Sequence, residues 1–61
     1  MFTIRIQTKL FEQYETRTHT APTLVLAKRT VEFYAGAQGF EFAEVVKDGE
    51  VVFYHEKAGI S

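Results

Sequence analysis

The chain has 61 residues, a formal net charge of −1 at pH 7 and no cysteine. This length allows one domain at most, so residues 1–61 are expected to form a single compact domain. The absence of cysteine excludes disulfide bonds and thiolate-based zinc sites. So short a chain buries only about 60% of its unfolded surface, and its stability therefore needs an unusually apolar core or self-association. The 46% hydrophobic content favours the first, with a homodimer as the alternative.

Charge is divided unevenly along the chain. Residues 1–30 carry five basic and two acidic side chains, a net +3, whereas residues 31–61 carry two basic and six acidic side chains, a net −4. Either the halves neutralise each other within one small sheet, or the acidic half faces a protein partner with a basic surface. No secretory signal and no run of about 20 apolar residues is found. Together with the lack of cysteine, this predicts a cytoplasmic protein without membrane contact.

The first half of the chain indicates two strands. Residues 2–7 alternate strictly between apolar and polar side chains, as a half-buried strand does. The alternation breaks at Leu10 and Phe11, where we expect a turn or bulge, and resumes over residues 14–20. Three threonines share one face of this second strand and make a weak core face, so the strand is expected at a sheet edge.

A helix is predicted over about residues 22–36. Pro22 suits its first turn, and Thr20 or Thr23 can supply the N-cap. Gly36 and Gly39 are candidates for the left-handed residue that ends the helix, and we favour Gly39.

The predicted helix is more apolar than one sheet face requires. An apolar stripe with helical period consists of Leu24, Ala27, Val31, Tyr34 and Ala35. Leu26 and Phe33 widen this stripe and form a surplus apolar flank.

The segments 40–46 and 50–56 are predicted to pair as a β-hairpin through a two-residue type I′ turn at Asp48-Gly49. The alternative is a three-residue loop with a bulge at Gly49, which shifts the pairing by one residue. In the first register Val46 faces Val51 and Val45 faces Val52. One face, assigned to the core, then carries Phe40, Phe42, Glu44, Val46, Val51, Phe53 and His55. The outer face carries Glu41, Ala43, Val45, Val52, Tyr54 and Glu56.

Glu44 is anomalous in this register, because it places a carboxylate among phenylalanines. A buried carboxylate needs a raised pKa or a partner such as His55 or a helix lysine. The alternative is that Glu44 lies near the sheet margin and bends outward.

The element order strand, strand, helix, strand, strand predicts an α+β fold. The simplest arrangement is a two-layer sandwich, in which one helix packs on one face of a four-stranded, mainly antiparallel sheet.

The sequence favours a protein that is not an enzyme. The only serine, Ser61, is the last residue, which is a poor place for a catalytic nucleophile. His19 and His55 show no metal-ligand spacing, and the glycines follow the helix, whereas a phosphate cradle precedes one. We therefore predict no catalytic residue, no metal and no cofactor.

The outer face of the C-terminal hairpin, together with an unpaired sheet edge, predicts a protein-binding module. Its expected contact residues are Ala43, Val45, Val52, Tyr54, Glu41, Glu50 and Glu56. In size and element order the chain is similar to small accessory proteins, including phage-encoded inhibitors, which implies a regulator, adaptor or inhibitor of a larger protein. The alternative is a nucleic-acid-binding domain that uses Arg5, Arg17 and His19, against which the acidic hairpin argues.

Overall fold

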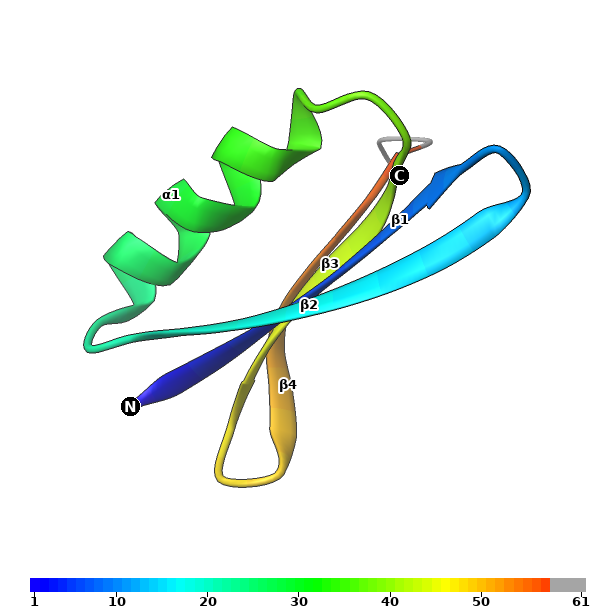
Figure 1. Ribbon diagram of the computed structural model, residues 1–61. Helices are drawn as coiled ribbons and strands as arrows, with labels where there is room; N and C mark the ends of the chain where they lie inside the picture. The colour runs from blue at the N-terminus through cyan, green and yellow to red at the C-terminus, as the bar shows by residue number, and fades with distance from the viewer. Residues whose placement is uncertain (58–61) are drawn as a thin grey trace.

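In residues 1–57, which the computed structural model describes, four antiparallel strands form one sheet and a helix lies across one of its faces (Figure 1). The elements in chain order are β1 (Phe2–Leu10), β2 (Gln13–Ala21), α1 (Leu24–Ala35), β3 (Phe40–Lys47) and β4 (Glu50–Glu56). The predicted ββαββ order and the α+β fold are confirmed.

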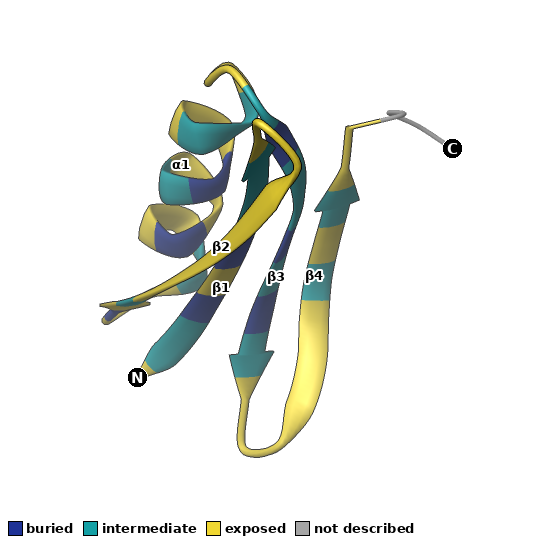
Figure 2. Ribbon diagram, turned by 45° about the vertical axis from the view of Figure 1, so that its right-hand side comes forward, coloured by how far each residue is buried: buried dark blue, intermediate teal, exposed yellow. Residues whose placement is uncertain are grey.

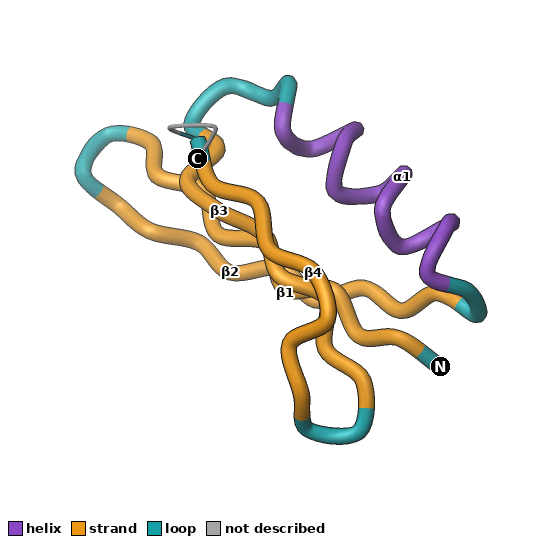
Figure 3. The backbone as a smooth tube through the Cα atoms, turned by 180° about the vertical axis from the view of Figure 1, so that it is seen from behind, coloured by secondary structure: helices purple, strands orange, loops and turns teal. Residues whose placement is uncertain are grey.

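The strands lie in the order β2-β1-β3-β4, so β2 and β4 are the edges of the sheet. β1 pairs antiparallel with both β2 and β3. β2 and β3 therefore run parallel to each other with β1 between them, and α1 connects them across that strand (Figure 3). The prediction that the threonine-rich strand lies at an edge is confirmed, but its threonines pair with Thr3, Arg5 and Gln7 and face away from α1, so the expectation that they form a core face is wrong.

α1 begins after Thr23, whose Oγ1 accepts a hydrogen bond of 3.2 Å from the Leu26 backbone N–H. This contact identifies Thr23 as the N-cap, where its hydroxyl satisfies one of the free donors of the first turn. The helix ends at Ala35, with Gly36 as its C-cap at a right-handed φ of −87°. Gly39 is left-handed, with φ of 86°, but it lies in the connection to β3 beyond this cap, so the prediction that Gly39 ends the helix is wrong. At 12 residues α1 is too short to cross a bilayer, and no helix in the described part of the chain meets that requirement.

The core lies between α1 and the central strands (Figure 2). The predicted stripe on the helix is confirmed: Ala27 and Val31 are buried, and Leu24, Tyr34 and Ala35 pack against the core. The surplus flank, Leu26 and Phe33, is exposed. The buried hydrophobic residues are Ile4, Ile6, Ala21, Ala27, Val31, Phe40, Ala43 and Val45.

The predicted faces of β3 are largely reversed. Val45 lies opposite Ile4 and Ala43 lies opposite Ile6, so these two β3 residues face α1. The assignment of Phe42, Glu44 and Val46 to the core is therefore wrong. Because successive side chains of a strand alternate between faces, these three lie on the face away from the helix. The reversal places the Glu44 carboxylate beside Arg5 of β1 and keeps its charge out of the core.

Because of a bulge in β4, the predicted register of the β3–β4 hairpin is only partly correct. Asp48 and Gly49 have φ of 53° and 81°, which confirms the type I′ turn, and Val46 pairs with Val51 as predicted. Val45, however, pairs with Phe53, which leaves Val52 as an extra residue on β4. Phe53 and His55 therefore face α1 as expected, whereas Val51 lies opposite Val46 and not in the core.

A second irregularity returns Phe40 to the core. Gln7 pairs with Phe42 and Thr8 pairs with Phe40, so Glu41 is the extra residue between them. Phe40 is consequently buried, as predicted, although it shares an even number with the outward-facing Phe42.

Candidate functional site

The sheet face opposite α1, called the open face below, is not covered by any helix in residues 1–57 (Figures 1 and 3). β1 and β2 contribute mostly polar side chains to it, and β3 and β4 contribute aromatic, aliphatic and acidic ones. From the strand registers, the open face carries Thr3, Arg5, Gln7, Lys9, Tyr14, Thr16, Thr18, Thr20, Phe42, Glu44, Val46, Val51, Tyr54 and Glu56.

Four residues of β3 and β4 form what we call the aromatic–acidic cluster: Phe42, Glu44, Tyr54 and Glu56. Phe42 pairs with Glu56, and Glu44 pairs with Tyr54. The two rings therefore occupy one diagonal and the two carboxylates the other. The rings stack with centroids 5.8 Å apart and an interplanar angle of 26°. Such diagonal contacts are within reach of aromatic side chains on neighbouring strands.

The two carboxylates of the cluster have different partners. Arg5 Nη1 donates to Glu44 Oε1 at 3.4 Å, and the Glu44 side chain is only 20% exposed. The Tyr54 hydroxyl donates to Glu56 Oε2 at 3.3 Å. Within residues 1–57 no lysine, arginine or histidine forms a salt bridge with Glu56. Glu56 thus meets solvent at the β4 edge as an anion without a cationic partner in the described chain.

The tyrosine hydroxyl reports this negative environment. Burial of the hydroxyl against its neighbours raises the pKa of Tyr54 above the ordinary value of 10.0. The charge of Glu56, the hydrogen bond to Glu56 and the charge of Glu44 raise it further. Ionisation of the phenol is disfavoured because it adds a negative charge beside two carboxylates.

The apolar surface continues from the aromatic pair toward the turn. Val46 lies opposite Val51 on the open face, and Val51 is exposed. Val52, the extra residue of the bulge, is also exposed. This strip gives the hairpin a row of apolar side chains along the β4 edge, next to the aromatic–acidic cluster.

The predicted protein-binding residues divide into two groups. Ala43 and Val45 are 0% exposed and belong to the core, so their placement on the outer face is wrong. The pairing of β3 with β1, which the hairpin sequence does not reveal, is the reason. Val52, Tyr54, Glu50 and Glu56 are exposed, and Glu41 is half-buried and forms a 3.4 Å ion pair with Lys57.

Sequence reasoning missed Phe42 and Glu44 as members of this surface. The charge of Glu44 was the available signal, because a carboxylate in mid-strand favours the solvent face. Following that signal would also have moved Phe42 outward.

The predicted nucleic-acid-binding set does not form one surface. Arg5 lies on the open face, whereas Arg17 and His19 are paired with Ile6 and Ile4 and face the helix side. The His19 ring lies 5.3 Å from the Tyr34 ring, and Arg17 is paired with Glu15 at 3.4 Å. The outer face predicted from these three residues is therefore wrong.

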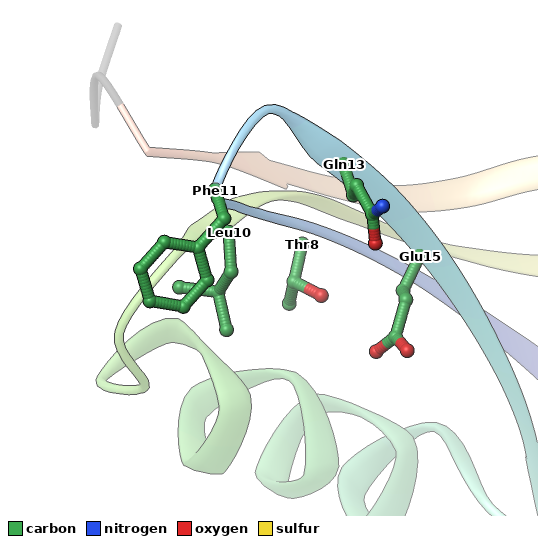
Figure 4. Close-up of a pocket in the computed structure, with 5 residues that line it drawn as sticks. All are labelled: Thr8, Leu10, Phe11, Gln13 and Glu15. Carbon is green, nitrogen blue, oxygen red and sulfur yellow. The ribbon is translucent and has the colours of Figure 1, made fainter.

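A metal site and a ligand pocket have little support among the described residues. No group of three histidine, aspartate or glutamate side chains in residues 1–57 is placed to hold a metal ion. A cavity of about 140 Å³ lies beside the first hairpin (Figure 4), which is small for a ligand pocket. Its lining residues are Thr8, Leu10, Phe11, Gln13 and Glu15. Ser61 lies outside the described residues.

Comparison of the chain with protein-family models, with curated proteins and with solved structures finds no match.

Proposed function

We propose that this chain is a non-enzymatic protein-binding module that uses the open face of its C-terminal hairpin. The observation that carries the proposal is the stacked pair of Phe42 and Tyr54 on the uncovered face, where Tyr54 is 51% exposed. Aromatic residues dominate binding hot spots because they bury large areas at a low entropic cost. Exposed apolar strips rimmed by charged residues are typical of interaction surfaces.

The edge strand β4 supports the same surface. β4 is an unpaired edge directly beside the aromatic–acidic cluster, and such an edge can accept a strand from another chain. Full-length antiparallel pairing of two β4 strands would place Glu50 of each copy opposite Glu56 of the other, and like charges in that position are destabilising. This favours a different protein over a second copy of the chain. The proposed role is that of a regulator, adaptor or inhibitor of a larger protein, as in phage-type accessory proteins.

The proposal is tested by partner capture with matched variants. The immobilised protein is incubated with lysate of its native host, and the captured protein is identified, purified and bound again. Tyr54→Ala is expected to abolish capture and rebinding, and Tyr14→Ala, a similarly exposed tyrosine on the same face, is expected to retain both. Unchanged circular dichroism shows that each variant folds. Retained binding by Tyr54→Ala, or equal loss in both variants, contradicts the assignment of the surface.

A further inference from the structure

Some aromatic rings of this chain have a lysine ammonium over one face, and others do not. Lysine Nζ atoms lie over the rings of Phe2, Tyr14 and Phe53, at 4.7, 5.2 and 5.1 Å from the ring centroids. Among residues 1–57 no lysine or arginine occupies such a position over Phe42 or Tyr54. Within residues 1–57 the ring pair beside Glu44 and Glu56 therefore lacks the lysine that the rings of Phe2, Tyr14 and Phe53 have.

The aromatic–acidic cluster is also asymmetric across the sheet. On its β1 side, Arg5 is the direct cross-strand partner of Glu44 and pairs with its carboxylate. On its other side β4 is the edge of the sheet, and within residues 1–57 no further strand supplies a cation to Glu56. We propose that an arginine side chain of the protein partner docks there, with its guanidinium on the ring of Tyr54 and its N–H groups toward Glu56. This inference rests on the proposed function and names the partner's anchoring residue.

The chemistry of the cluster favours arginine over other ligands. A guanidinium is planar, stacks on aromatic rings and donates two parallel hydrogen bonds to a carboxylate. An ammonium is a point charge that can lie over a ring but lacks the planar fork for two parallel hydrogen bonds. A phosphate backbone is disfavoured because Glu44 and Glu56 would repel it. An uncharged side chain of similar shape would stack but would leave the charge of Glu56 uncompensated.

The test is a nuclear magnetic resonance titration of the full-length ¹⁵N-labelled protein. Three blocked tripeptides serve as probes: acetyl-Thr-Arg-Thr-amide and the same peptide with lysine or with citrulline, the uncharged analogue of arginine. The arginine peptide is expected to shift the amide signals of Phe42, Glu44, Tyr54 and Glu56. The lysine peptide should bind several-fold more weakly, and the citrulline peptide should produce no saturable shift. Equal responses to arginine and citrulline, or no response to arginine, overturn the proposal.

Two pairs of variants locate the probe on the surface. Tyr54→Leu and Glu56→Gln are each expected to weaken binding of the arginine peptide by about 5-fold, the equivalent of ~1 kcal/mol. Tyr14→Leu and Glu50→Gln are the matched controls. The ring of Tyr14 already has Lys9 over it, and Glu50 is an exposed carboxylate on β4, the strand of Glu56. Equal weakening in the controls assigns the effect to overall charge or to nonspecific stacking and overturns the proposal.

The titration tests the arginine anchor and the partner capture tests the binding surface, so the two proposals can be contradicted separately. If Tyr54→Ala abolishes capture but the arginine peptide leaves the cluster unperturbed, the binding surface stands and the arginine anchor is wrong. If Tyr54→Ala also leaves capture intact, the proposed function is wrong together with the anchor that rests on it.

Discussion

Ile4 lies directly opposite Val45 in the sheet, and both side chains are fully buried under α1. This pair sets the faces of β3, because every second residue from Val45 must share its side. A slip of one residue would bring Glu44 under the helix and remove Phe42 from the open face. The candidate binding surface therefore depends on a contact in the core.

The register predicts unequal costs for two neighbouring valines. Val45→Ala removes two buried methyl groups and leaves a cavity, so it should lower the free energy of unfolding by about 2 kcal/mol. Val46→Ala, at a half-buried position on the open face, should cost about 1 kcal/mol or less. Urea unfolding of both variants measures the difference as a shift of the midpoint. A larger cost for Val46→Ala would show that the faces of β3 are assigned wrongly.

Gly39 is predicted to be irreplaceable, whereas Gly36 is not. A Cβ at Gly39 would lie 2.7 Å from the Lys9 carbonyl oxygen, and its φ is 86°, so Gly39→Ala should cost about 2 kcal/mol or more. Gly36 has a right-handed φ and its nearest neighbour lies at 4.0 Å. Gly36→Ala should therefore be neutral or stabilise the fold by about 0.5 kcal/mol. Thermal unfolding of the two variants compares them, and similar losses would contradict the close approach at Gly39.

Substitutions in the turn between β1 and β2 are expected to stabilise the folded protein. Phe11 and Glu12 have φ of 52° and 67°, a conformation that favours Asn-Gly and strains larger side chains. Phe11 is 95% exposed, so replacing it loses little packing. The double variant Phe11→Asn/Glu12→Gly is expected to raise the free energy of unfolding by about 1–2 kcal/mol. A loss of stability in urea unfolding would mean that Phe11 packs in the folded protein.

Titration of Tyr54 tests the acidic environment of the cluster. The pKa of Tyr54 is raised in the folded protein, so the folded state holds the phenol proton more tightly than the unfolded chain does. Its contribution to stability is complete below the unfolded pKa and is lost as pH rises through the folded pKa. Glu56→Gln removes a charge that raises this pKa and should lower it, whereas Glu50→Gln should leave it unchanged. The ¹³Cζ chemical shift of Tyr54 as a function of pH measures both variants, and an unchanged pKa in Glu56→Gln would contradict the proposed electrostatics.

The candidate site was only partly predictable from the sequence. Tyr54 and Val52 could be placed on an exposed face, because the Asp48-Gly49 turn and local alternation indicate where β4 begins. For Phe42 and Glu44 the only local signal was the charge of Glu44, which favours the solvent side, while the hairpin pattern favoured the opposite face. The face that they occupy follows from the pairing of β3 with β1. The contact between Arg5 and Glu44 joins residues 39 positions apart in the chain, and no local sequence pattern predicts a contact between residues so far apart in the sequence.

Local sequence patterns are enough to specify the main secondary-structure elements of this protein. Alternating side chains specify β1, the spacing of Leu24, Ala27 and Val31 specifies the buried side of α1, and Asp48-Gly49 specifies a type I′ turn, since each of these depends only on near neighbours. The order of the strands and the bulges at Glu41 and Val52 depend instead on contacts between distant segments. These contacts therefore also set which side of the second hairpin faces the helix. The bulges are decided by long-range packing, because each inserts one residue where Phe40 or Phe53 must reach the core while Glu44 must stay out of it.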